Sequence, residues 1–328
     1  TIHSFCQQLL SSFPLEAGLV PGFRALEERE QRELARECLE EMVVESEQRA
    51  DDVLLDALHV LALRLGEKAT EAYLLRCAAA HTAFAALPGD IREWLFGALD
   101  LPTGDVEVEI ASRCADEVFD VKALARAARA NADWGTATGL KAADCITAWL
   151  ARSPEGRAQT LDELAKCFLT GKAEPKVVTS GQTKVCEDYQ SLADRICENI
   201  SEITALRTRV AYADLVVCGL IAGRAYAAAY EQGKRRKGAV DFDDLIAHGA
   251  ALLSSPGIAD WIRYKVDQRI DHILVDEAQD TNSRQWAIVG ALGEEFFAGE
   301  GARTGFRTLF TVGDFKQAIY GFQGTDPT

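Results

Sequence analysis

Two short β-rich runs near the C-terminal end constrain the fold more than any other feature of the chain. Residues 270–275 and 308–312 are mostly apolar, and each run leads into acidic residues. Segments with helical periodicity flank both runs, which favours buried parallel strands. Parallel strands of α/β proteins carry functional groups at their carboxyl ends, where ligands bind. We therefore expect an α/β region in this part of the chain.

Helical periodicity dominates the residues before those runs. Apolar side chains recur at helical spacing over residues 22–153, with breaks predicted at Gly66 and at residues 135–139. Residues 171–184 are rich in Gly, Lys, Ser and Thr and predict an exposed loop or hairpin, and helices resume over residues 187–232. The predicted fold class is α/β with a large all-α insertion.

Composition places the chain among soluble cytoplasmic proteins. Its 328 residues suffice for about two domains, and 48% of them are hydrophobic against 26% charged. Uninterrupted apolar stretches are shorter than the roughly 20 residues of a membrane span, so no membrane partner is expected. The nine cysteines form no Cys-x-x-Cys pair and lie on apolar faces, which is typical of reduced thiols in the cytoplasm.

The formal net charge of −16 opposes extensive nucleic-acid binding, because basic surface supplies most of the affinity for phosphate. Half of that excess lies in residues 27–56, which hold twelve acids and four arginines. Residues 234–237, Lys-Arg-Arg-Lys, form the one dense basic cluster. This cluster is either a local DNA contact or a solvated helix end.

Two adjacent carboxylates, Asp276 and Glu277, follow the first β-rich run directly. A bare Asp-Glu pair at a strand end is also typical of a solvated acidic turn. In nucleotide hydrolysis, however, a strand-end Asp holds Mg²⁺ and a neighbouring acid orients or deprotonates the attacking water. The pair therefore predicts a catalytic site at this strand end.

A second polar loop follows residues 308–312. It contains Gln317 and two aromatic residues, Tyr320 and Phe322, and glycines lie close to Phe322 on both sides. Loop aromatics usually pack into a core, and this alternative stays open for Tyr320. An exposed ring beside a polar loop can instead stack on a nucleobase, a contact of about 1–3 kcal/mol per base.

Four motifs, in this order along the chain, resemble those of UvrD/Rep-type superfamily 1 DNA helicases. TIHSFC at residues 1–6 is similar to their TFH-type motif, which touches single-stranded DNA. DFDDL at residues 241–245 is similar to the motif that follows a helical insertion in these helicases. DEAQD at residues 276–280 is similar to their Walker B motif, and residues 312–324 resemble their motif III. Residues 1–18, with EEFFAGEG and FQGTDP, resemble AddA-type proteins of helicase-nuclease complexes.

The resemblance implies ATP and Mg²⁺ as cofactors and assigns their contacts. Asp276 is expected to hold Mg²⁺ through water, and Glu277 to activate the attacking water. Gln317 is expected to sense the γ-phosphate and couple it to the DNA site. The fold implied is a partial RecA-like parallel sheet of the P-loop NTPase type.

The resemblance also implies two partners, which are single-stranded DNA and an AddB-like nuclease subunit. Thr1 and His3 are expected to contact the DNA backbone, and Tyr320 and Phe322 the bases. Gln323 departs from the Arg that many relatives carry there, so no phosphate contact is assigned to it. The implied activity is ATP-dependent translocation on DNA ends during double-strand break repair and recombination.

The implied domains are residues 1–20, part of the first motor domain; residues 21–235, the helical insertion; and residues 236–328, the remainder of the motor domain. No G-x-x-x-x-G-K-[ST] loop occurs in the sequence, and Thr1 stands where a start Met would be. We therefore expect an internal piece of a longer polypeptide that is inactive as an ATPase by itself. The alternative function is a non-catalytic acidic helical scaffold that binds a partner and retains relic motor motifs.

Overall fold

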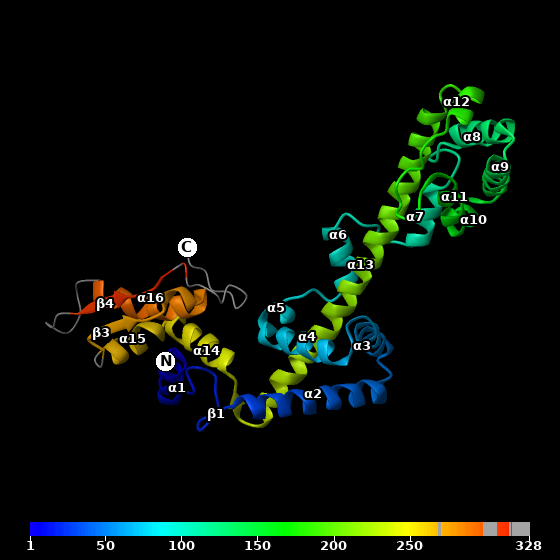
Figure 1. Cartoon of the computed structure of the whole chain (residues 1–328). Coiled ribbons are helices and arrows are strands. Elements are labelled where there is room, and N and C mark those ends of the chain that lie inside the picture. Colours follow the sequence, from blue (N-terminus) through cyan, green and yellow to red (C-terminus); the bar gives the residue numbers. More distant parts are fainter. Residues whose placement is uncertain (268–269, 298–306, 315, 317–328) are drawn as a thin grey trace. The chain divides into compact units, whose positions relative to one another are not determined.

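The computed structural model describes residues 1–267, 270–297, 307–314 and 316 (Figure 1). Within these ranges the protein is mostly helical and contains two small parallel sheets of two strands each. The chain folds into two compact units. The first unit comprises Thr1–Asp51, Glu71–Ala85 and Gly223–Thr328, and the second comprises Asp52–Thr70 and Ala86–Ala222.

The first unit contains both sheets and the helices around them. Its elements are α1 (Ile2–Ser12), β1 (Arg24–Ala25), α2 (Glu28–Arg49), most of α4 (Glu67–Ala79), α5 (His81–Ala85), the end of α13 (Tyr189–Arg236), β2 (Ala239–Val240), α14 (Phe242–Ser254), α15 (Ala259–Asp267), β3 (His272–Val275), the 3₁₀ turn η1 (Ala278–Asp280), α16 (Ser283–Phe297) and β4 (Thr308–Thr311).

The regular secondary structure in the described part of the second unit is helical apart from one isolated bridge between Leu169 and Pro175. Its elements are α3 (Asp52–Leu65), α6 (Ile91–Ala98), α7 (Val106–Arg113), α8 (Val121–Trp134), α9 (Ala137–Leu150), α10 (Pro154–Gln159), α11 (Leu161–Phe168), α12 (Ser180–Val185) and residues 189–222 of α13.

Strands β3 and β4 confirm the predicted parallel pairing, in register from His272 opposite Thr308 to Val275 opposite Thr311. The expectation that both strands are buried is wrong. Leu274 and Phe310 pair with each other and are 70% and 60% exposed. Side chains alternate between the two faces of a strand, so these residues share one face, which the described residues leave largely uncovered.

Helix α1 packs against α14 in the core of the first unit. Cys6 and Leu10 of α1 are fully buried together with Leu253 of α14. Gly249 permits the close approach, since a Cβ there would lie 3.0 Å from the Cys6 sulfur. This packing holds the first residues of the chain against the start of α14.

Helix α13 is long and apolar enough to span a membrane. Core helices of soluble proteins can have the same length and composition. In its apolar window, 44% of the residues are buried inside the protein. Val210, Ala213 and Val217 of the same helix are buried in the core of the second unit. Its role as a core helix accounts for much of its apolar character.

Candidate functional site

Asp276 and Glu277 lie at the carboxyl end of β3, where the sequence places them, and both are exposed. A carboxylate oxygen of Asp276 accepts a hydrogen bond from the backbone N–H of Glu277 at 3.0 Å. The short contact ties the first carboxylate to the turn that follows the strand. The two acids thus leave the strand as one ordered unit.

Glu277 has a left-handed backbone conformation, with φ 53° and ψ 46°. In this region the Cβ of a residue other than glycine crowds its own backbone, at a cost of about 1–3 kcal/mol. Such conformations persist only where the surroundings enforce them, and they concentrate at active sites and switch regions. Ala50, Asp100 and Ala173 have similar φ values, so what distinguishes Glu277 is this backbone together with the contact that holds its carboxylate.

Gln279 connects the ends of the two strands. Its side-chain Nε2 donates to Glu277 Oε2 at 2.5 Å, and its Oε1 accepts from the backbone N–H of Asp314 at 2.9 Å. The backbone N–H of Ala278 adds a second link by donating to Val312 O at 2.9 Å. No role is predicted for Gln279 from the sequence, where its one signal is its position inside DEAQD.

Two further motifs meet where α1 packs against α14. Thr1 caps α1 by accepting from the backbone N–H of Ser4, and the His3 ring packs edge-on against Phe242 with 5.4 Å between ring centroids. Burial lowers the pKa of His3, and the nearby Asp243 carboxylate opposes that shift. Burial likewise raises the pKa of Asp243, and Asp241 adds to the effect.

A buried ion cluster joins the end of α13 to the start of α14. The Lys234 ammonium lies 2.6 Å from Glu231 Oε1, 2.6 Å from Asp244 Oδ2 and 3.1 Å from Asp241 Oδ2. Burial alone would lower the pKa of Lys234, but the Asp241 and Asp244 carboxylates outweigh it and raise that pKa. The two aspartates also form the capping box of α14, so the cluster fixes where that helix begins.

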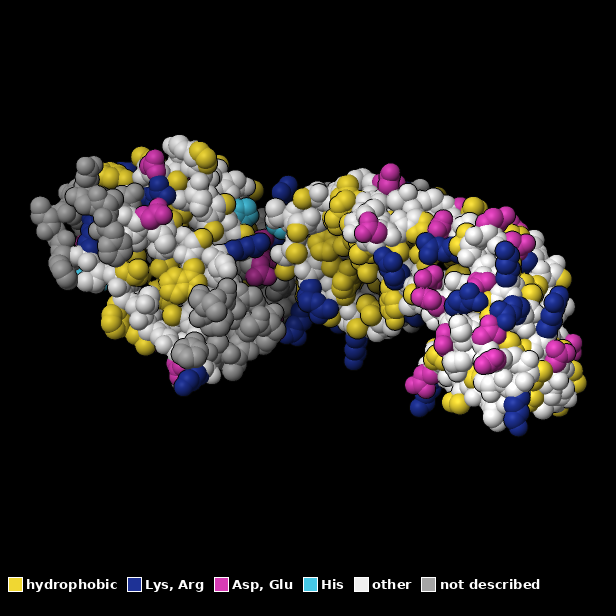
Figure 2. Space-filling model, turned by 90° about the horizontal axis from the view of Figure 1, so that it is seen from above, with side chains coloured by type: hydrophobic (Ala, Val, Ile, Leu, Met, Phe, Trp, Pro, Cys, Tyr) yellow, Lys and Arg dark blue, Asp and Glu magenta, His cyan; other side chains and the backbone are white. Residues whose placement is uncertain are grey.

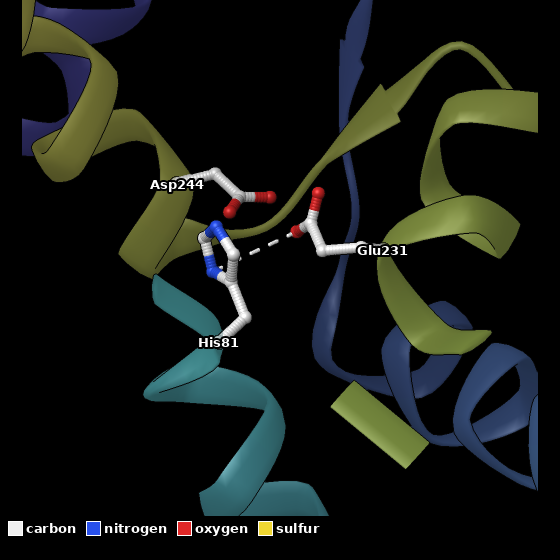
Figure 3. Close-up of side chains that lie close together, drawn as sticks. All are labelled: His81, Glu231 and Asp244. Carbon is white, nitrogen blue, oxygen red and sulfur yellow. Dashed lines mark ion pairs between the residues drawn. The ribbon is translucent and has the colours of Figure 1, made fainter. Parts of the chain in front are cut away.

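His81 completes a group with metal-ligand character (Figure 3). Single ligand atoms of His81, Glu231 and Asp244 all lie within 4.8 Å of one another, and His81 Nδ1 is 4.0 Å from Glu231 Oε1. The Lys234 ammonium, however, contacts both carboxylates directly. Since these carboxylates already have a cation, the group is best explained as a structural ion cluster.

Of the basic cluster at residues 234–237, only Lys234 is buried, and Arg235, Arg236 and Lys237 lie exposed at the end of α13. Lys234 is buried in the ion cluster, Arg236 pairs with Glu41 at 2.5 Å, and Lys237 pairs with Glu37 at 2.5 Å. The acidic helix α2 therefore matches the charges of Arg236 and Lys237. On the face of the second unit seen in Figure 2, basic and acidic side chains are also intermixed.

The remaining predicted site residues, Gln317, Tyr320 and Phe322, lie outside the described residues. The structure brings together Asp276 with Glu277, and Thr1 with His3.

Comparison with known proteins identifies the family. The UvrD/REP helicase N-terminal domain matches residues 1–328. An ATP-dependent helicase/nuclease subunit from Exiguobacterium sibiricum is 26% identical, and the corresponding protein from Syntrophomonas wolfei is 23% identical, each over 100% of this chain. The chain covers only 28% and 27% of these two relatives.

A shorter stretch is similar to a second group of proteins. The ATP-dependent DNA helicase UvrD1 of Mycobacterium bovis is 42% identical over 107 residues, which cover 31% of this chain and 13% of that protein. These matches confirm the resemblance to UvrD/Rep-type helicases and to AddA-type proteins. Since the family match spans the whole sequence, this chain belongs to the UvrD/REP helicase N-terminal domain family.

Proposed function

We propose that these residues form part of the motor of an ATP-dependent DNA translocase of the AddA type. The observation that carries the proposal is the conformation of Glu277, which has a left-handed backbone at a strand end while Gln279 holds its carboxylate. A solvated acidic turn needs no buried amide to hold its carboxylate. A site that must present one carboxylate in a fixed direction does.

The residues at the end of β3 fit an ATP·Mg²⁺ complex. Carboxylate oxygens and water are the ligands that Mg²⁺ prefers, and the exposed Asp276 offers a carboxylate at a strand end. Bound Mg²⁺ would neutralise charge on the phosphoryl group being transferred. Asp276 would hold the ion through water, while its bond to the Glu277 N–H keeps its carboxylate in one orientation.

Glu277 would orient the attacking water and accept its proton. Gln279 holds Oε2, and Oε1 of Glu277 makes no hydrogen bond to any residue in the described ranges. That second oxygen is therefore available to a water molecule. Gln317 would sense the γ-phosphate from the segment that follows β4.

The partners and cellular role proposed here rest on the relatives. These relatives are named as one subunit of an ATP-dependent helicase/nuclease, which supports a further subunit, together with nuclease activity, in the complete assembly. We propose single-stranded DNA as the track, with Thr1, His3, Tyr320 and Phe322 as contacts, and an AddB-like nuclease as the partner. The process would be double-strand break repair and recombination in the bacterial cytoplasm.

The proposed domains are a RecA-like motor domain built from residues 1–20 and 236–328, and a helical insertion over residues 21–235. The packing of α1 on α14 and the parallel β3–β4 pair support the motor domain. The second compact unit lies within residues 21–235 and supports the helical insertion, whereas residues 21–51, 71–85 and 223–235 belong to the first compact unit.

Residues 1–328 contain no G-x-x-x-x-G-K-[ST] loop to cradle the phosphates. We therefore propose that these residues by themselves do not hydrolyse ATP at a useful rate, because phosphoryl transfer depends on positioning both sides of the triphosphate. The scaffold alternative rested on the acidic run. Glu37 and Glu41 of that run have cationic partners within the first unit, so no specific observation favours the alternative.

The test is DNA-stimulated ATP hydrolysis by the complete gene product. Glu277→Gln should abolish the stimulation, whereas Glu294→Gln, the same change at an exposed glutamate of α16, should leave it intact. Absence of ATP hydrolysis in a folded wild-type protein, or full activity of Glu277→Gln, would contradict the proposal.

A further inference from the structure

We propose that Gln279 is a positioning residue that fixes the Glu277 carboxylate and couples it to the end of β4. The inference rests on the proposed function, since it assumes that Glu277 activates water. It assigns a role to a residue that touches neither the nucleotide nor the water itself. Its basis is the pair of hydrogen bonds that one buried side-chain amide makes in opposite directions.

The orientation of the amide follows from its two partners. A backbone N–H can only donate, so the atom of Gln279 that faces Asp314 N at 2.9 Å must be the oxygen. The NH₂ group then faces Glu277 Oε2 at 2.5 Å, where an ionised carboxylate can only accept. A flipped amide would break both bonds, so this chemistry permits one arrangement.

The surroundings leave the side chain no alternative position. Gln279 is only 6% exposed, and Gly313 passes so close that a Cβ there would lie 2.7 Å from its Oε1. The Ala278 N–H to Val312 O bond holds the backbone of the turn at the same strand end. The buried amide thus transmits any displacement of Gly313 and Asp314 to the Glu277 carboxylate.

This arrangement gives the segment after β4 control over the catalytic carboxylate. When Asp314 is in place, Gln279 holds one oxygen of Glu277 and directs the other outward. When Asp314 moves, the amide oxygen of Gln279 loses the N–H group that donates to it, and the Glu277 carboxylate loses its fixed direction. Gln279 therefore makes the activity of Glu277 depend on the position of the β4 end.

Three variants of the complete gene product test the inference through steady-state ATP hydrolysis with single-stranded DNA. Gln279→Glu keeps the acceptor for Asp314 and removes the donor to Glu277. Gln279→Met removes both bonds at similar volume, and Gly313→Ala displaces the amide while Gln279 remains. Each should lower kcat about 10- to 100-fold with KM for ATP changed less than about twofold, the scale expected for a misplaced catalytic group.

Gln285→Glu is the matched control, because Gln285 acts through its oxygen, which accepts from the Asn282 N–H at 3.0 Å. It should retain wild-type kcat. Folded Gln279 and Gly313 variants with wild-type kcat would overturn the inference. Loss of folding in all three variants would also overturn it, because Gln279 would then serve stability. If Glu277→Gln remains fully active, the proposed function itself has failed; if only the Gln279 and Gly313 variants remain active, this inference alone has failed.

Discussion

The ammonium group of Lys234, near the end of α13, lies 2.6 Å from the carboxylate of Asp244 in the first turn of α14. Both side chains are buried, and Asp241 and Glu231 complete the cluster. The contact joins the last turn of the longest described helix to the DFDDL motif. A basic residue that looks available for DNA in the sequence is therefore part of the interior of the first unit.

Lys234→Met should strongly destabilise the first unit. The change leaves buried carboxylates without their cation, which typically costs about 3–5 kcal/mol. The matched control is Lys237→Met, which breaks an exposed pair with Glu37 and should cost less than about 1 kcal/mol. Denaturant unfolding of both variants measures the difference. Equal effects of the two substitutions would contradict the structural role assigned to Lys234.

The stability of the first unit should fall between pH 9 and pH 11. Burial raises the pKa of Cys6 from 9.0 to about 11, so the unfolded chain loses this proton first as the pH rises. The stabilisation is fully present below pH 9 and is lost as the pH approaches 11.

Comparison with Cys6→Ala isolates the contribution of that thiol. The difference in unfolding free energy between wild type and variant should shrink by about 1–3 kcal/mol over this window. A difference that stays constant from pH 8 to pH 11 would show that the Cys6 thiol ionises alike in the folded and unfolded chains.

His3→Ala in the complete gene product should weaken binding of single-stranded DNA about 2- to 10-fold, the range of one neutral hydrogen bond. Because burial lowers the pKa of His3, the ring is neutral at pH 7 and displaces no counterion. The dependence of affinity on salt should therefore stay unchanged. His59→Ala, at an exposed histidine of α3, is the control. Unaltered affinity would leave His3 only its packing against Phe242.

Local sequence signals predicted much of the secondary structure. Gly66 separates α3 from α4, and Gly135 ends α8 with a left-handed φ of 69°, as the breaks in periodicity indicate. The β3 and β4 runs pair in parallel as expected. Strands β1 and β2 escaped prediction because each is two residues long, too short for a periodic pattern.

The features that were missed depend on contacts between distant parts of the chain. Arg236 and Lys237 find Glu41 and Glu37 across about two hundred positions of sequence, so a basic run read in isolation looks unpaired. The role of Gln279 likewise depends on Asp314, which comes from another strand end. For the site, the sequence predicted that Asp276 and Glu277 end a strand, but no pattern reveals the left-handed backbone of Glu277.

The most direct test of the central claim, that Glu277 activates the attacking water, is single-turnover ATP hydrolysis by the complete gene product bound to single-stranded DNA. Glu277→Gln should bind ATP with wild-type affinity and hydrolyse it about 10²- to 10⁴-fold more slowly, the usual contribution of a general base. Hydrolysis within about twofold of wild type, with ATP binding intact, would contradict the account and return the Asp276–Glu277 pair to an ordinary acidic turn.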